Sequence, residues 1–141
     1  MKPQIAGHFY SVIAGVLIVL LLIAGTPLPG AAQAQALHVS RALISLDVID
    51  REPVGEGWRF PVQARRVYCY TAVEGADSPT SITHAWYYED RKVHTYTLPV
   101  EAASWRTWSY KNIAGSQKGD WKVEVLDAQG KVLTTVHFVM D

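Results

Sequence analysis

The fold is decided by residues 120–140, which read DWKVEVLDAQGKVLTTVHFVM. Successive side chains of a β-strand point to opposite faces of a sheet, and apolar residues beginning with Trp121 alternate here with charged ones. The turn-rich segment 127–130 separates this run from a second apolar run, and Gly130 can adopt the positive φ that a tight turn requires. The stretch therefore predicts a β-hairpin whose first strand places Trp121 in the core.

The same alternation extends from this hairpin back to His38, with turn residues between the apolar runs. The predicted strands are residues 38–50, 66–73, 82–88, 92–98, 105–111, 120–126 and 131–140. A shorter piece begins at Trp58-Arg59-Phe60, and Pro61 confines it to a sheet edge or a strand end. Residues 51–57 and 74–81 are predicted to be loops.

About seven or eight short antiparallel strands favour an all-β fold, an immunoglobulin-like β-sandwich. A small closed barrel is the alternative. In the first strand, the apolar set Ala42, Ile44, Leu46 and Val48 is expected to face the core. Cys69, in a later strand, is expected to be a small buried hydrophobe. Because it is the only cysteine of the chain, no internal disulfide is available.

Residues 1–36 have the organisation of a secretory signal peptide. They contain no acidic residue and one lysine, and an uncharged apolar run covers residues 11–25. Helix-breaking prolines and a glycine follow, and two overlapping Ala-x-Ala sites place cleavage after Ala34 or Ala36. The chain is therefore expected to be exported, with a mature domain over residues 37–141 in the periplasm.

An uncleaved membrane anchor is the alternative for this segment. As a helix, the run 11–25 would span roughly 22 Å, which is short of a ~30 Å hydrocarbon core. Extending the helix back to Ile5 gives a segment, residues 5–25, that is long enough to cross. In that case the domain would be anchored to the cytoplasmic membrane and would still lie outside the cytoplasm.

The charge balance argues against a nucleic-acid partner. The 141 residues include 13 Lys and Arg and 13 Asp and Glu, so the formal net charge is zero. Proteins that bind nucleic acid normally carry a basic excess or a basic stripe. Binding of nucleic acid is therefore not expected.

No metal site, cofactor or catalytic group is expected from the histidines and the cysteine. His38, His84, His94 and His137 lack the spacings typical of metal ligands and are expected to be surface or half-buried residues. His84 and His94 lie in the predicted hairpin 82–98. A loop of two or four residues would place them on opposite faces of the sheet, and a loop with an odd number of residues would place them on the same face. The surroundings of Cys69 do not favour a reactive thiolate, and no G-x-S-x-G motif occurs. The domain is therefore predicted not to be an enzyme.

The candidate binding residues come mainly from one aromatic strand. Alternation places Trp105 on one face of it and Arg106, Trp108 and Tyr110 on the other, so one tryptophan is expected to meet the core. Arg106 is a candidate cation–π partner for a ring on a neighbouring strand. Tyr87 joins the candidates from the strand 82–88. Aromatic rings beside arginine are typical of protein interfaces, and flat rings also stack on sugars.

Five separated motifs occur in order along the mature chain. They are REP at 51–53, VYCYT at 67–71, THAWYY at 83–88, WRTWSYKN at 105–112 and GDWKVEV at 119–125. Together they resemble the bacterial domain-of-unknown-function family 2914, over roughly residues 40–140. The resemblance implies an extracytoplasmic β-rich domain behind a signal or membrane segment, and it implies no established activity. Where that family often has an Asn-Gly turn, this sequence has Glu89-Asp90-Arg91.

The sequence thus predicts an exported, non-catalytic module of the cell envelope that acts as a protein-interaction or accessory domain. The predicted binding residues are Trp108, Tyr110, Arg106 and Tyr87. The alternative is binding of carbohydrate or cell-wall glycan through exposed rings, chiefly Trp108 and Tyr110. Neither function requires a metal or a cofactor.

Overall fold

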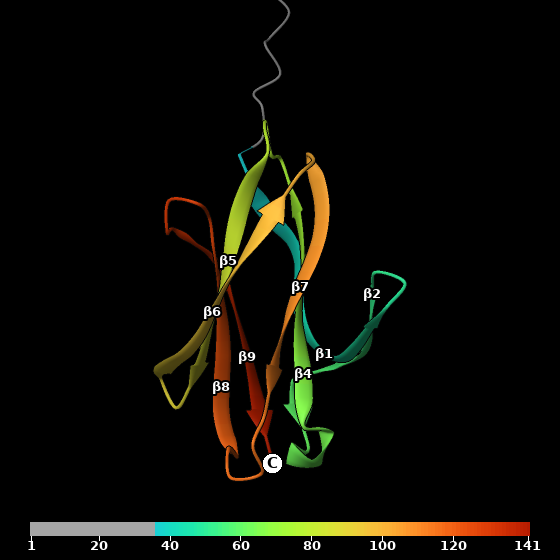
Figure 1. Cartoon of the computed structure of the whole chain (residues 1–141), viewed down its shortest axis with the longest axis vertical. Coiled ribbons are helices and arrows are strands. Elements are labelled where there is room, and N and C mark those ends of the chain that lie inside the picture. Colours follow the sequence, from blue (N-terminus) through green and yellow to red (C-terminus); the bar gives the residue numbers. More distant parts are fainter. Residues whose placement is uncertain (1–35) are drawn as a thin grey trace, which may run out of the picture. The chain divides into compact units, whose positions relative to one another are not determined.

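The structure is a computed structural model that describes residues 36–141, which form two stacked β-sheets (Figure 1). The predicted all-β fold is confirmed, and the sandwich is confirmed at the level of two sheets enclosing a core. The predicted signal or anchor segment, residues 1–36, lies outside the described residues except for Ala36. Residues 36–141 contain no helix with the length and apolar character needed to cross a bilayer.

Nine strands and one short 3-10 helix make up the described part of the chain. They are β1 (His38–Ile49), β2 (Glu52–Gly57), β3 (Arg59–Phe60), η1 (Val62–Ala64), β4 (Arg66–Glu74), β5 (Thr80–Tyr88), β6 (Arg91–Val100), β7 (Ser104–Asn112), β8 (Gly119–Leu126) and β9 (Val132–Met140). Each of the seven main predicted strands is present, with ends that differ by one or two residues.

Sheet A has the strand order β2-β1-β4-β7, and sheet B has the order β3-β9-β8-β5-β6. Neighbouring strands are antiparallel except for β3 and β9, which run parallel. The two sheets share no strand within residues 36–141, so they form an open sandwich and not the closed barrel. As Pro61 predicted, the short piece after Trp58 lies at a sheet edge.

The core between the sheets consists of two apolar clusters. The larger one contains Trp86 and Trp121 with residues of both sheets, and the smaller one contains Val73, Ile82, Val100 and Val125. Trp86, Trp121 and Phe138 of the larger cluster are at most 2% exposed. The predicted placement of Trp121 in the core is confirmed.

The predicted core face of the first strand is only partly correct. Ile44 is fully buried, but Leu46 is 44% exposed and Val48 is half-buried, while Ser45 is buried. From about Ser45 onward, β1 leaves the sandwich and pairs with β2 alone, since its pairing with β4 ends at Ser45. Apolar side chains beyond that point have no opposite sheet to pack against.

The predicted loop at residues 51–57 was wrong, because residues 52–57 form β2. This strand pairs with β1 from Ile49–Glu52 to Ile44–Gly57. Its sequence, EPVGEG, carries two glycines and two glutamates and one strongly apolar residue, so no period-two pattern marks it. Pairing with β1 makes it a strand.

The two clearest turns use positive φ as their sequences allow. Gly130 has φ 85°, as predicted for the hairpin between β8 and β9. Glu89 and Asp90 have φ 47° and 60° and form the two-residue turn between β5 and β6. A two-residue loop was expected to place the histidines of this hairpin on opposite faces. A bulge after Trp86 instead sets His94 opposite Trp86, and therefore on the face of His84.

Candidate functional site

Three of the four predicted binding residues lie on an edge strand. β7 ends sheet A, and Arg106, Trp108 and Tyr110 point away from the core while Ser109 between them is buried. Tyr110 is 40% exposed and Trp108 is half-buried. On the other face, Trp105 packs against the smaller core cluster. The predicted division of this strand into a core face and an outer face is confirmed.

Tyr110 stands in the middle of an aromatic band that joins the edges of the two sheets. Its ring centroid lies 5.9 Å from that of Tyr68 on β4 and 6.4 Å from that of Tyr96 on β6. His94 extends the band, 4.3 Å from Tyr96, and the guanidinium of Arg66 lies 4.4 Å from the Tyr110 ring centroid. The planes of the tyrosine rings are tilted by 53° and 41°, so the band is not a flat platform.

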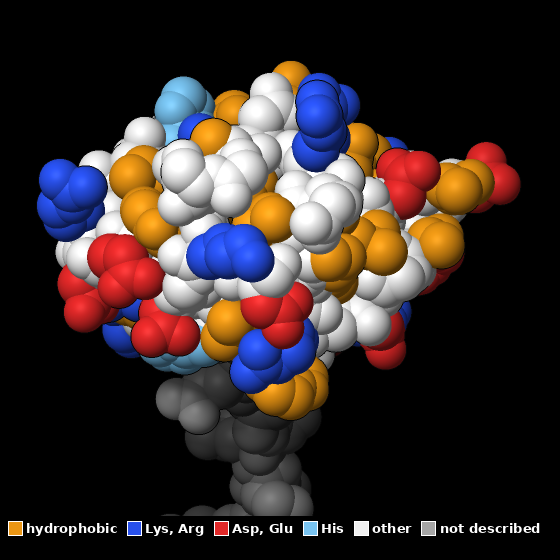
Figure 2. Space-filling model, turned by 90° about the horizontal axis from the view of Figure 1, so that it is seen from below, with side chains coloured by type: hydrophobic (Ala, Val, Ile, Leu, Met, Phe, Trp, Pro, Cys, Tyr) orange, Lys and Arg blue, Asp and Glu red, His pale blue; other side chains and the backbone are white. Residues whose placement is uncertain are grey.

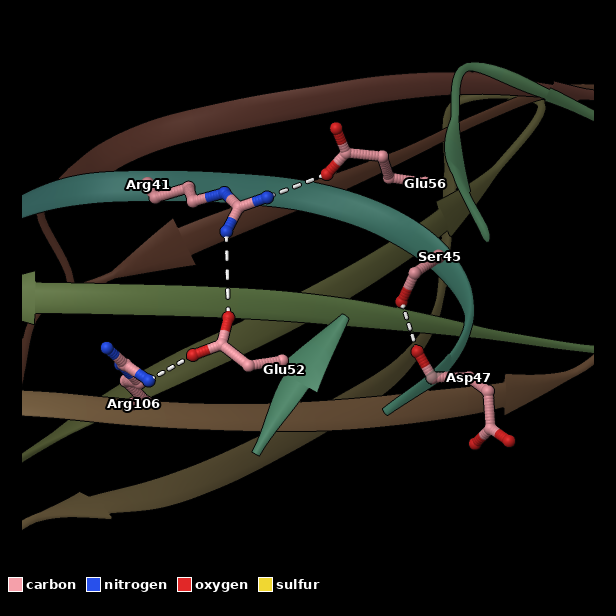
Figure 3. A network of polar contacts seen from close by, with 6 residues as sticks. All are labelled: Arg41, Ser45, Asp47, Glu52, Glu56 and Arg106. Carbon is pink, nitrogen blue, oxygen red and sulfur yellow. Dashed lines mark hydrogen bonds and ion pairs between the residues drawn. The ribbon is translucent and has the colours of Figure 1, made fainter. Parts of the chain in front are cut away.

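The β1–β2 hairpin bends back over the outer face of sheet A and is held there by ion pairs (Figure 3). Arg41 lies 2.7 Å from Glu56 and 3.9 Å from Glu52, and Glu52 also pairs with Arg106 on β7. Ala72 lies between the two arginines in register, and its small side chain leaves room for the Glu52 carboxylate. These side chains are about half exposed, so each pair contributes at most about 1 kcal/mol.

The bent hairpin explains an unexpected buried ring. Tyr70 alternates with Cys69 and Thr71 and so faces outward, yet it is 1% exposed. Leu43 and Trp108 are its cross-strand neighbours, and the guanidinium of Arg41 lies 5.8 Å from its ring centroid. Much of the outer face of sheet A is therefore covered, and Tyr110 remains open at its edge.

Arg51, and not Arg106, lies over the tryptophans of β7. Its guanidinium lies 5.5 Å from the Trp105 ring and 6.0 Å from the Trp108 ring, and it donates to the carbonyl oxygen of Arg106 at 3.2 Å. The Arg106 side chain is engaged with Glu52. The cation–π role predicted for Arg106 thus belongs to Arg51 in the turn of the β1–β2 hairpin.

Tyr87, the fourth predicted residue, lies on sheet B and is not brought together with the others. Its hydroxyl donates to Glu124 at 3.1 Å. The ammonium groups of Lys122 and Lys92 lie 4.8 and 5.6 Å from its ring centroid. The ring is half-buried and already surrounded by these partners.

A buried polar network ties the two sheets together at His84, which was expected to be no more than half-buried and is fully buried. Its Nε2 lies 3.0 Å from Thr71 Oγ1 on β4, and its Nδ1 lies 2.8 Å from Ser109 Oγ on β7. Trp86 donates its indole N–H to the same serine oxygen at 3.0 Å. Thr71 Oγ1 also lies 4.0 Å from the sulfur of Cys69.

One arrangement of protons satisfies every group of this network. Ser109 accepts from Trp86 and donates to His84 Nδ1, and Nε2–H then donates to Thr71, whose hydroxyl faces the Cys69 sulfur. Burial lowers the pKa of His84 to about 3, so the imidazole is neutral near pH 7. Because Ser109 and His84 are at most 3% exposed, no substrate can reach this pair. The network is structural.

Cys69 is buried, as predicted, in the same region. It is fully inaccessible, and burial raises the pKa of its thiol to about 12, partly offset by the hydrogen bond with Thr71. The thiolate is the reactive form. The geometry therefore gives Cys69 no access to a substrate and no means of forming a nucleophile.

We expect iodoacetamide to leave Cys69 unmodified in the folded protein at pH 8 and to alkylate it fully in concentrated urea. The thiol of the folded protein is both inaccessible and protonated, so alkylation requires local or global unfolding. Mass spectrometry of samples taken over several hours checks this. Rapid labelling of the folded protein would contradict the buried position of the thiol.

The described surface offers shallow hollows and mixed charge. On the face that Figure 2 shows, acidic and basic side chains are interspersed, with small groups of hydrophobic atoms between them. One hollow of about 620 Å³ lies between η1 and the loop after β7 and is lined in part by Arg65, Ile113 and Lys118. Within residues 36–141, no three or more His, Cys, Asp or Glu side chains are grouped as metal ligands would be.

Two features were missed by the sequence analysis. His84 was not distinguished from the other histidines, although its position on the face of Ile82 and Trp86 was a usable signal. Trp58 was treated only as the start of a short strand, yet it is 65% exposed, the largest exposed fraction among the big hydrophobic side chains of the described part.

Comparison with known proteins finds one family model that matches the second half of the described chain. Residues 79–140, which run from the start of β5 to the end of β9, match the model of a family described as "Protein of unknown function (DUF2914)". Three of the five motifs lie within this range, and the two motifs before residue 79 lie outside it. A comparison with curated proteins gives no match. The match over residues 79–140 thus supports the DUF2914 family that the motifs resemble.

Proposed function

We propose that this chain is an exported, non-catalytic module of the cell envelope that binds a protein partner along β7. Export and a periplasmic location are supported by the signal-like pattern of residues 1–36. If that segment is not cleaved, residues 5–25 would anchor the same domain to the cytoplasmic membrane. Either arrangement presents the sandwich to partners outside the cytoplasm.

The observation that carries the proposal is the open edge of β7 beside exposed aromatic side chains. Unpaired strand edges are usually blunted by shortness, proline or bulges. In the described residues, β3 has two residues, and β6 contains Pro99 and pairs with β5 through a bulge. β7 has nine residues, no proline and a continuous register with β4, and it has no second partner strand in residues 36–141.

The side chains around this edge suit an extended protein segment. Such a segment can add to a sheet through backbone hydrogen bonds, and neighbouring side-chain contacts provide specificity. Trp108 and Tyr110 supply rings of the type found at interface hot spots. Arg51 and Arg66 lie against these rings and have no carboxylate within 4.0 Å among the described residues. Acidic or aromatic side chains on the partner would therefore complement the edge.

The immunoglobulin-like type of sandwich belongs to the same proposal. The order β1-β4-β7 against β9-β8-β5-β6 corresponds to strands A-B-E against G-F-C-C′ of that fold. Cys69 on β4, Trp86 on β5 and Val123 on β8 share the larger core cluster. Antibody domains pack a strand-C tryptophan against a disulfide between strands B and F. Here a valine would stand at the strand-F position.

We expect a photo-crosslinking amino acid in place of Tyr110 to form a protein adduct in intact cells. The matched control is the same amino acid in place of Val132, which is similarly exposed, at 46%, but lies on β9 away from the open edge. Trp108→Ala should lower adduct formation about tenfold, the size of effect expected for an interface hot spot. The readout is immunoblotting of the full chain followed by mass spectrometry of the adduct.

Two results would contradict the proposal. Equal adducts at positions 110 and 132 would indicate non-specific encounter, and an unchanged adduct in Trp108→Ala would remove the ring from the interface. Binding of glycan at β7 is less well supported, because the Tyr110 ring is tilted by 53° and 41° against the neighbouring rings of Tyr68 and Tyr96. An adduct at position 110 that contains carbohydrate and no protein would nevertheless establish it.

A further inference from the structure

A second exposed surface, on sheet B, has the features of a small ligand site. It is a hollow of about 280 Å³ beside the start of β3, which we name the Trp58 hollow. Its lining includes Trp58, Trp121, Phe138, Asp90, Asp120 and His137. A smaller hollow of about 80 Å³ shares four of these residues and adds Glu89 and Lys122. An apolar floor with a few converging polar groups is typical of ligand sites.

Trp58 forms an exposed wall that is held in place. Its carbonyl oxygen accepts the Val139 N–H at 2.8 Å, which fixes its backbone against β9. The guanidinium of Arg59 lies 4.9 Å from the Trp58 ring centroid and is itself held 2.7 Å from Asp141. The ring is 65% exposed. The Trp58 ring is therefore exposed to solvent while its backbone and its neighbour Arg59 are held in place.

The polar rim of the Trp58 hollow is also fixed. The turn between β5 and β6 is tied to the start of β8 twice: the Glu89 N–H donates to the Asp120 carbonyl at 3.0 Å, and the Glu89 carboxylate accepts the Asp120 N–H at 3.1 Å. Lys122 lies 3.4 Å from Asp90. These contacts fix the backbone of the turn against the start of β8, so that Asp90 and Asp120 both line the hollow, with the Asp90 side chain 93% exposed.

The rim offers both donors and acceptors, which identifies the class of ligand. Asp90 and Asp120 accept hydrogen bonds and His137 can donate or accept them, while Lys122 is a donor in the adjoining smaller hollow. A free cation would meet the ammonium of Lys122, and an anion would meet the carboxylates. A neutral ring with hydroxyl groups, each a donor and an acceptor, matches the rim, and its apolar face matches the Trp58 indole.

We propose that the Trp58 hollow binds one pyranose unit of a neutral saccharide. The volume suits a single ring and not a long chain. This site lies on β3, β8 and β9 and the β5–β6 turn, and it uses none of the β7 residues, so it does not depend on the proposed protein partner. Loss of one activity leaves the other testable.

The test uses the full-length chain on an array of neutral and acidic glycans, followed by calorimetric titration with the neutral oligosaccharide that binds best. The expected result is binding to neutral glycans only. Trp58→Ala should weaken it about tenfold through loss of ring contact. Asp90→Asn, at a φ of 60° that asparagine tolerates, should also weaken binding and gives a second variant if Trp58→Ala fails to fold. Val132→Ala, at an exposed residue that lines neither hollow, is the control and should bind normally, and Trp108→Ala is measured beside it to separate this site from β7.

Three outcomes would overturn the inference. These are no binding to any neutral glycan, tighter binding of acidic glycans than of neutral glycans, and loss of binding in Trp108→Ala with retention in Trp58→Ala. The last outcome would move glycan recognition to β7 and would count against the proposed protein partner as well. The crosslinking result at Tyr110 should be unaffected by Trp58→Ala.

Discussion

Trp86→Ala is expected to lower the free energy of unfolding by about 3–5 kcal/mol, the range for removing a large buried aromatic side chain. Trp86 is fully buried and packs edge-on against Phe138 at a centroid distance of 6.2 Å. It also donates to Ser109 on the other sheet. The substitution thus opens a cavity in the larger core cluster and removes one hydrogen bond between the sheets.

Urea denaturation of residues 36–141, followed by circular dichroism, measures this effect. Trp58→Ala is the matched control, because the same change at a ring that is 65% exposed should cost less than about 1 kcal/mol. Trp86→Phe should lower the free energy of unfolding by an intermediate amount, since an aromatic ring still fills part of the space and Ser109 still donates to His84. Equal midpoints for Trp86→Ala and Trp58→Ala would contradict the assignment of Trp86 to the core.

The stability of the domain is expected to fall between pH 6.5 and pH 3 because His84 is buried as a neutral ring. Its pKa in the folded protein is lowered to about 3 from 6.5. As pH falls below 6.5, the unfolded chain binds a proton at this position and the folded chain does not, so the equilibrium shifts toward unfolding. Above pH 6.5, His84 is neutral in both the folded and the unfolded chain, so it no longer contributes to the change of stability with pH.

The expected loss from His84 is about 2 kcal/mol between pH 7.5 and pH 5, since each pH unit below 6.5 costs about 1.4 kcal/mol. Denaturation curves at half-unit intervals of pH give the slope. His84→Gln should be less stable at pH 7.5 but should show a shallower fall toward pH 5. His137→Gln, at an exposed histidine, is the control. An unchanged slope in His84→Gln would show that other groups cause the pH dependence.

Local features of the chain were predicted well because their causes are local. Alternation of apolar and charged residues placed Trp121 in the core and Cys69 among buried neighbours. The turn at Gly130 followed from the conformational freedom of glycine, and the edge position of β3 followed from Pro61. Each of these features depends on residues within a few positions of one another, so it depends little on which distant segments pack against them.

The candidate sites depended on contacts that no local pattern contains. Alternation places His84 on the apolar face of Ile82 and Trp86, but its full burial depends on Thr71 and Ser109, from other strands, which satisfy both ring nitrogens. Arg51 reaches the tryptophans of β7 because the β1–β2 hairpin bends over sheet A. The same bend exposes Leu46, which alternation had assigned to the core.

The sequence by itself determined the seven main strands between residues 38 and 140, because side-chain alternation is a property of the extended chain. Only the tertiary structure decided which strand lies at an open edge and which ring remains exposed. Strand order is set by pairing between distant segments, and exposure is set by what those segments cover. For that reason β7 and Trp58, which carry the two proposals, could be located only in the folded sandwich.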